Sequence, residues 1–539
     1  MTHVPPLQAL RSARAVPLAP ARRPSVALVG GGPTTLYALQ VLSEHDVPFD
    51  IHVFEKDGHV GPGMPYREGI NHPQMLANIG GRELPPLLEP LHDWLTRCDA
   101  EALQAMGIDR AEIGPDAFYP RVVLGRYFTA QLAGLVARAR SKGHAVTLRA
   151  RHRVLDIRPE REIAIEWESP SGRDSATFDH VVLATGHHWR SDVTDLGIRM
   201  QRPWPVEDLR RFIGESVAIL GTSLTAIDAA VALAGFHGRF VEDGSAARWE
   251  TNGPAEGFHL TMMSRKGLLP PADWYYTLPL PELANLTGKA AQRAIAAGAD
   301  GLLDRCHELL VRDLESIDSA LAKRLQLSCL DGLAERFFAD RMDLDTWEAT
   351  RLDLEIAEAD RRLHRADPWR MALLRAHEVL EEVIPHMTEA DRERLNRELK
   401  PIFTDCYASV PHRSVRRMMA LHEAGVLDVV RLNADYHMVD HGRGVEITYA
   451  SGKLQVAGVI DARGQQSADL VSLFPGLAAL ASGLSFDPVS CAVTLPEDCQ
   501  GTLTCVSIPV LLPTDPFVQG LERARDLGHM AARRIVASV

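Results

Sequence analysis

The sequence lacks paired cysteines, long apolar runs and any surplus of basic residues. Its seven cysteines are scattered without a C-x-x-C pair, which is typical of reduced thiols in a cytoplasmic protein and excludes a disulfide framework. No stretch approaches the ~20 apolar residues of a membrane span, and no metal-ligand motif is present. The net charge of −13 leaves nothing basic to displace counterions from a nucleic acid. We therefore expect a cytoplasmic protein that binds neither nucleic acid nor membrane nor a metal.

The chain of 539 residues is too long for one compact core and predicts two or three domains. Its 46% apolar and 24% charged residues are ordinary values for a globular protein. Residues 1–24 are rich in Pro and Arg and lack the apolar core of a signal peptide. They are interpreted as a flexible tail, with an organelle transit peptide as the alternative.

The first motif is a glycine-rich loop that follows an apolar strand, "SVALVGGGPTTLYALQVL" at 25–42. Gly30 and Gly32 take the first two glycine places of G-x-G-x-x-G, and Thr35 takes the third. The two glycines permit the tight turn and the approach of a pyrophosphate, and the next helix points its N-terminus at the phosphates. The following strand ends in Glu55, where an acid accepts ribose hydroxyls. Together these features predict a dinucleotide site.

A second loop, "ESVAILGTSLTAIDAAVALAG" at 215–235, repeats this layout with Gly221 in the first glycine place and Ser223 in the second. The next strand ends in Ser264 and Arg265 rather than in an acid. A hydroxyl and a guanidinium bind a 2′-phosphate, which an acid would repel. The pattern indicates NADPH in preference to NADH, and a basic strand end on the surface is the alternative.

Two further strands end in glycine-containing turns. "FDHVVLATGHH" contains Gly186, and "GVIDARG" contains Asp461 and Gly464. Both are interpreted as segments that return the chain to the first nucleotide domain after an excursion. The predicted fold is α/β, with two Rossmann-like dinucleotide-binding units, the second inserted into the first, and an added helical segment.

On these motifs the chain resembles FAD/NAD(P)-binding flavoproteins of the "NAD-binding 9" type and, more broadly, class B flavin monooxygenases. The similarity runs from 25 to 535 and includes "GPGMPYREGINHPQMLANIGG" at 61–81 and the C-terminal turn and helix. It implies FAD in the first unit and NADPH in the second. The predicted cofactor-binding residues are Gly30, Gly32, Thr35, Glu55, Lys56, Asn78, Gly186, Gly221, Ser223, Ser264, Arg265, Asp461, Gly464 and Gln519.

Some motifs of the resembling enzymes are absent from this sequence, and their absence limits the reactions that the resemblance implies. The Baeyer–Villiger fingerprint is absent, and "MQRPWPVEDL" stands in its place. No C-x-x-x-x-C follows Gly32, which excludes the disulfide-reductase chemistry of the same architecture. A subgroup of the resembling enzymes N-hydroxylates amino acids, including nitrosuccinate-forming enzymes, and its long helical segment is similar to the one found here.

That helical segment has a 3.6-residue apolar rhythm in "DPWRMALLRAHEVLEEVIP", with Asp367 as the predicted N-cap and Pro385 at the end. An Arg-rich run follows it. Tyr407, Arg413 and Arg416 are predicted to bind the substrate, since an Arg pair can clamp a carboxylate. Surface charges on an amphipathic helix are the alternative for this run.

The predicted divisions are a tail at 1–24, an FAD domain at 25–195, an NADPH domain at 196–280, a helical cap at 281–425 and the return of the FAD domain at 426–539. The expected function is an FAD-dependent, NADPH-driven monooxygenase that N-hydroxylates a small carboxylate-bearing amine such as an amino acid. Molecular oxygen is the second substrate, and homo-oligomer formation stays open. A flavin oxidoreductase or oxidase without oxygen insertion, or a nucleotide-sensing protein, is the alternative. The sequence identifies no catalytic side chain.

Overall fold

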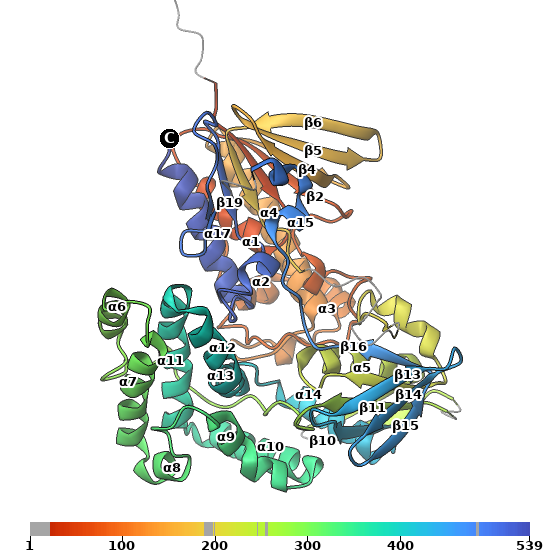
Figure 1. The fold of residues 1–539 in the computed structure, drawn as a ribbon. Helices are drawn as coiled ribbons and strands as arrows, with labels where there is room; N and C mark the ends of the chain where they lie inside the picture. Colours follow the sequence, from red (N-terminus) through yellow and green to blue (C-terminus); the bar gives the residue numbers. More distant parts are fainter. Residues whose placement is uncertain (1–21, 188–197, 199, 245, 254–256, 481–484) are drawn as a thin grey trace, which may run out of the picture.

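The computed structural model describes residues 22–187, 198, 200–244, 246–253, 257–480 and 485–539. Its first unit, at the top of Figure 1, is built on a seven-stranded sheet. In spatial order the strands are β17 (Phe486–Asp487), β18 (Ala492–Val493), β19 (Thr502–Cys505), β7 (His180–Leu183), β1 (Ser25–Val29), β2 (Asp50–Glu55) and β3 (Ala145–Ala150). The five strands from β19 to β3 are parallel, as a sheet covered on both faces by other elements requires.

Three helices cover one part of this sheet: α1 (Pro33–Leu42), α4 (Arg121–Ser141) and α17 (Leu521–Val536). All five residues of β1 are buried, and the inner faces of the three helices share one apolar core with the sheet. The last helix crosses very close to α1, because a Cβ built on Gly528 would lie 2.4 Å from the carbonyl oxygen of Thr34. The C-terminal helix α17 therefore packs in close contact with α1, the helix that follows the first glycine loop.

The remaining elements of the first unit are short. They are β4 (Arg153–Pro159), β5 (Ile163–Ser169) and β6 (Gly172–Phe178), η1 (Met64–Tyr66), α2 (Leu91–Arg97), α3 (Ala100–Met106), η2 (Arg110–Glu112), α15 (Leu470–Leu473), η5 (Pro475–Leu480) and α16 (Ile508–Leu511). Strands β4 to β6, which lie between β3 and β7 in the sequence, form a separate antiparallel sheet of three strands.

The second unit has a four-stranded parallel sheet in the order β12 (Leu427–Arg431), β11 (His259–Ser264), β8 (Ser216–Leu220) and β16 (Gly458–Asp461). Helix α5 (Leu224–His237) follows β8, as α1 follows β1. A meander of β13 (Tyr436–Asp440), β14 (Val445–Tyr449) and β15 (Gly452–Val456) precedes the closing strand. The other elements are η3 (Val206–Phe212), β9 (Gly238–Asp243), β10 (Ala246–Thr251) and α14 (His412–Glu423).

The two units repeat one plan: strand, glycine loop, helix, two more strands, a meander and a closing strand. The second lies between β7 and β17 of the first sheet, which confirms the predicted insertion. One prediction is wrong. The segment from Gly458 to Asp461 does not return to the first sheet, because β16 pairs with β8, and β12 also belongs to the second sheet. The first domain therefore resumes after β16 rather than at 426. A short apolar strand carries no signal that tells one parallel sheet from the other.

The helical segment is inserted inside the second unit, between β11 and β12. Its helices are α6 (Gly288–Ala296), α7 (Leu302–Ile317), α8 (Ser319–Arg324), α9 (Leu333–Asp343), α10 (Thr346–Leu363), α11 (Pro368–Val383), η4 (Ile384–His386), α12 (Glu389–Glu398) and α13 (Lys400–Tyr407). The predicted N-cap is confirmed, since the Asp367 carboxylate accepts hydrogen bonds from the backbone N–H groups of Trp369 and Arg370.

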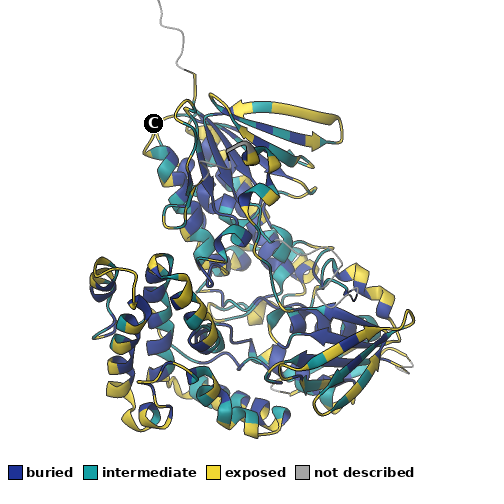
Figure 2. Ribbon diagram, in the orientation of Figure 1, coloured by how far each residue is buried: buried dark blue, intermediate teal, exposed yellow. Residues whose placement is uncertain are grey.

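These helices have an apolar core of their own, centred on α7, α11 and α13. Figure 2 shows their buried residues turned inward, with the exposed residues on the outside of the lower left part of the molecule. Among the described helices, none combines the length and apolarity that crossing a bilayer requires.

Candidate functional site

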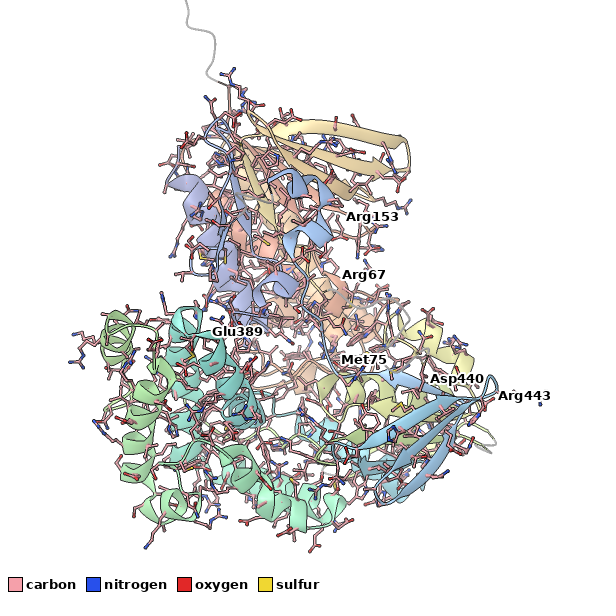
Figure 3. The ribbon with its side chains drawn as sticks, viewed as in Figure 1. Arg67, Met75, Arg153, Glu389, Asp440 and Arg443 are labelled. Atoms are coloured by element: carbon pink, nitrogen blue, oxygen red, sulfur yellow. The ribbon has the colours of Figure 1, made fainter. Side chains whose placement is uncertain are left out.

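The three parts of the chain meet around a cleft with a cavity volume of about 1690 Å³. That volume exceeds the roughly 300–1,000 Å³ that is usual for a single small-molecule pocket. The first unit contributes the ends of β1, β2 and β7 and the C-terminal turn, the second unit contributes the start of α5, and the helical segment contributes α11 and α13. Arg153, labelled on the first unit in Figure 3, lies on this lining.

The first glycine loop forms a bare cradle at one end of the cleft. Gly30 and Gly32 both line it. Gly30 has φ +110°, and a Cβ there would lie 2.0 Å from the carbonyl oxygen of Ala184, so only glycine fits. No side chain caps α1 and no acid stands in its first turn. The donor set and the space fit a dinucleotide pyrophosphate.

Glu55 closes this cradle from the end of β2. The backbone N–H of Gly31 donates to its Oε2 at 2.9 Å, and that of Asp57 donates to its Oε1 at 3.0 Å. Glu55 and Lys56 both line the cleft, as the ribose-binding prediction requires. The acid is therefore held in a fixed position beside the loop.

Thr35 has a different place from the one predicted. Its side chain is buried, and its hydroxyl donates to the carbonyl oxygen of Gly30 at 2.5 Å. It is not among the residues that line the cleft. The hydroxyl in the third glycine place thus stabilises the conformation of the loop from the side that faces away from the cleft.

Three other predicted residues line the same cleft: Asn78, Gly186 and Gln519. Asn78 lies in the loop at 61–81, which does more than border the cleft. Met75, labelled in Figure 3, is buried in the apolar core of the second unit. The loop therefore connects the two units as well as contributing to the site.

The second glycine loop repeats the cradle. Gly221 has φ +133°, and a Cβ there would lie 2.7 Å from the carbonyl oxygen of Ala462. Ser223 is the N-cap residue of α5, makes no side-chain capping bond and lines the cleft. Gly464 also lines the cleft, whereas the Asp461 carboxylate is bonded to Arg463. Because β16 pairs with β8, Asp461 and Gly464 follow a strand of the second sheet and lie beside the second glycine loop rather than the first.

Ser264 and Arg265 stand beside this second loop. The hydroxyl of Thr222 donates to Ser264 Oγ at 3.1 Å, and the backbone N–H of Gly267 donates to the same oxygen at 3.0 Å. Arg265 is exposed and has no hydrogen-bond or ion-pair partner among the described residues. Neither Ser264 nor Arg265 is among the residues that line the cleft, so the binding of a ribose phosphate by Arg265 stays a prediction.

The helical wall of the cleft, defined here as the lining residues of α11 and α13, contains groups that the sequence did not single out. Tyr407, a predicted substrate residue, lies there with its ring 5.0 Å from the His377 ring. His377 Nε2 bonds to Glu381 Oε1 at 3.1 Å. Burial acts to lower the pKa of His377, but the hydrogen bond and charge of Glu381 outweigh it and raise the pKa. Phe517 of the first unit packs edge-on against the same imidazole.

A second group of residues, which the sequence analysis did not identify, lies where the first unit meets the segment between β11 and α6. The Tyr276 hydroxyl donates to Glu83, and both residues line the cleft. Burial raises the pKa of Asp273 to about 6, with Arg361 acting in the opposite direction. Burial also raises the pKa of Glu522, and neighbouring Glu378 and Glu83 add to the shift. These carboxylates come from segments that are far apart in the sequence, so no local sequence pattern predicts that they lie in one cleft.

The predicted Arg clamp is wrong. Arg413 and Arg416 are absent from the lining of the cleft, and each is paired with a carboxylate elsewhere. Arg413 bonds to Glu242 of β9, and Arg416 Nη2 bonds to Glu358 of α10 at 2.6 Å. Their run forms α14, which begins at His412 and packs in the second unit. The amphipathic-helix alternative is the correct one, because an Arg on such a helix satisfies its charge with the nearest acid.

Arg417, the third arginine of the run, has a structural role with a measurable consequence. It is buried, donates to Glu242 Oε1 and donates to the carbonyl oxygen of Gln74 at 2.7 Å. Arg417→Ala is expected to lower the free energy of unfolding by about 2–3 kcal/mol, since it removes a buried guanidinium together with its bonds to Glu242 and to the Gln74 carbonyl. The exposed Arg413→Ala should cost less than about 1 kcal/mol. Urea unfolding of the two variants measures the difference, and equal losses would contradict this role.

The chain is similar to two family models and to one related protein over nearly its whole length. A family model described as FAD-NAD(P)-binding matches residues 27–188, and one described as YdhS-like middle domain matches residues 287–407. The uncharacterized protein YdhS of Escherichia coli strain K12 is 34% identical over 522 residues, covering 95% of this chain and 97% of that protein. The chain belongs to the YdhS family. In this YdhS-family chain the helical segment is the middle domain, and the first unit is an FAD/NAD(P)-binding domain, which confirms the predicted class of cofactor.

Solved structures of similar architecture are more distant from the YdhS-family chain. The ornithine N-hydroxylase KtzI of Kutzneria sp. 744 is 14% identical with a TM-score of 0.48, covering 96% of this chain and 99% of its own. The lysine monooxygenase NbtG of Nocardia farcinica is 13% identical with a TM-score of 0.42, covering 94% and 99%. The bacillithiol disulfide reductase Bdr of Bacillus cereus is 12% identical with a TM-score of 0.41, covering 96% and 99%. At these values the neighbours do not identify the reaction.

Proposed function

We propose that this YdhS-family chain is an FAD-dependent, NADPH-driven monooxygenase that inserts oxygen into an amine. The observation that carries the proposal is the single cleft shared by the first glycine loop, the start of α5 and the helical wall. Bound FAD would supply the redox and oxygen chemistry, with NADPH as the reductant. In this arrangement Gly30, Gly32 and Glu55 hold the first dinucleotide, while Gly221, Ser223 and Arg265 hold the second.

The lining as a whole holds nearly as many lysines and arginines as acids, but one group of acids within it favours an amine over a neutral sulfur or carbon substrate. Glu83, Asp273, Glu378 and Glu522 all line the cleft, and burial raises the pKa of Glu522, with Arg525 acting against the shift and Glu378 and Glu83 adding to it. A protonated amine is attracted to such a surface. Oxygen transfer needs the nitrogen lone pair, so the ammonium must lose its proton in the cleft. The Glu522 carboxylate, with its raised pKa, is suited to accept that proton.

Thiol–disulfide chemistry has little support in this cleft. Cys406 is the one cysteine among the described residues that line it. Burial raises the pKa of its thiol to about 12, so the reactive thiolate is scarce at neutral pH. This supports an oxygenase, or the alternative oxidoreductase without oxygen insertion, over a disulfide reductase.

Labelled oxygen separates these remaining functions. The FAD-loaded protein with NADPH under ¹⁸O₂ is expected to transfer one labelled atom to an amine in a panel that includes aspartate and ornithine. Mass spectrometry reads hydroxylamine, oxime or nitro products. Substrate-independent NADPH consumption with only hydrogen peroxide would favour the oxidoreductase or oxidase. Label on sulfur or carbon would keep the oxygenase and remove the amine, and no NADPH consumption at all would favour a nucleotide sensor.

A further inference from the structure

The helical wall contains a cationic group that, unlike Arg413 and Arg416, has no hydrogen bond or ion pair with any residue that the structure describes. Lys400, at the start of α13, lines the cleft. Thr404 and Tyr407 lie four and seven residues further on, so the three side chains share one face of α13, and all three line the cleft. The Thr404 and Tyr407 hydroxyls lie 3.2 Å apart. One ammonium and two hydroxyls therefore face the same cavity.

The other basic groups at this end of the cleft are already neutralised. Arg375 bonds to Glu378 Oε2 and to Glu282 Oε1, each at 2.6 Å. Arg523 of the first unit bonds to Asp515 Oδ2 at 2.7 Å. On the helical wall, among the residues that the structure describes, Lys400 is the lysine or arginine with no hydrogen bond or ion pair to an acid.

The surroundings of Lys400 leave its charge incompletely compensated. Burial lowers the pKa of its ammonium, and the one acid that acts against this shift is Asp515. Asp515 is itself engaged by Arg523 and by the backbone N–H of Phe517. An anionic ligand would restore a full counter-charge in a partly dry site, where charged hydrogen bonds are strong.

We propose that Lys400, with Thr404 and Tyr407, binds the carboxylate of the substrate and selects amines that carry an acidic group. This inference rests on the proposed function, because it names the substrate class of the same cleft. Acids elsewhere on the lining (Glu83 and Glu522) attract the amine, so the two ends of an amino acid find opposite charges in one cavity. Lys400 replaces the predicted pair of Arg413 and Arg416 as the group that fixes substrate orientation.

The test compares an amino acid with the same amine lacking its carboxylate. L-ornithine and putrescine are titrated calorimetrically into FAD-loaded protein, without NADPH or oxygen. Lys400→Met is expected to weaken ornithine binding by about tenfold to a hundredfold and to leave putrescine binding unchanged. Lys400→Arg should restore most of the ornithine affinity. Lys323→Met, which removes an exposed lysine of α8, is the matched control.

The outcomes also separate this inference from the proposed function, since binding needs no turnover. A Lys400-dependent preference for ornithine without any labelled product would keep the carboxylate site and remove the monooxygenase. Equal weakening of both probes by Lys400→Met would overturn the carboxylate assignment. So would the failure of wild-type protein to bind ornithine more tightly than putrescine, even if an amine were oxygenated.

Discussion

Gly32→Val is expected to give a colourless protein that still folds. Gly32 is the N-cap residue of α1 with φ −95°, an ordinary conformation for any residue. A Cβ there meets only the Gly63 Cα at 3.5 Å, so the fold has room for a side chain. That room is where the backbone would approach a pyrophosphate. FAD affinity should fall by roughly a hundredfold or more, equivalent to ~3 kcal/mol of lost binding.

The measurement is flavin absorbance per protein after purification, together with the urea unfolding midpoint. Gly114→Val is the matched control, because a Cβ at Gly114 meets no atom within 4 Å and the residue lies outside the cleft lining. Gly30→Ala makes the contrast sharper. Its Cβ would clash with Ala184 and its φ is +110°, so that variant should lose stability as well as flavin. Full flavin content in Gly32→Val would show that the first loop does not hold the dinucleotide.

Arg265→Ala is expected to lower kcat/KM for NADPH by about tenfold to a hundredfold and to leave kcat/KM for NADH unchanged. The loss of a charged partner of the 2′-phosphate costs roughly 1.5–3 kcal/mol, and NADH has no such phosphate to lose. Arg265 is exposed at the end of β11, so its removal leaves no buried group unpaired. The rate of flavin reduction under anaerobic conditions measures the effect for each nucleotide.

Two further variants test whether Arg265 recognises the 2′-phosphate specifically. Arg265→Lys keeps the charge but loses the bidentate geometry, so its NADPH preference should be intermediate. Arg248→Ala removes an exposed arginine of β10 that is paired with Glu250, and it should change neither nucleotide. A parallel loss with NADPH and NADH in Arg265→Ala would assign this residue to the structure of the second unit instead.

The sequence by itself determined the two nucleotide units and their nesting. Each glycine loop is contiguous with its strand and helix, so Gly30, Gly32, Gly221 and Ser223 were visible as local patterns. Glu55 was visible at the end of the strand that follows the first loop, and Arg265 directly after β11, the next strand of the second sheet. Turn conformation and helix N-termini depend on neighbours in the chain, so each glycine loop forms at the strand–helix junction where its pattern predicted it.

Only the tertiary structure decided which groups meet in the cleft. The strand from Gly458 to Asp461 was assigned to the wrong sheet, because pairing between parallel strands is settled by burial over the whole unit. The Arg run looked like a clamp until its acidic partners, 58 and 171 residues away in the sequence, were in place. Lys400 could not be identified from the sequence, because whether a charged side chain has a partner depends on its neighbours in the tertiary structure. The sequence holds no local record of such surroundings, since they are assembled from three separate parts of the chain.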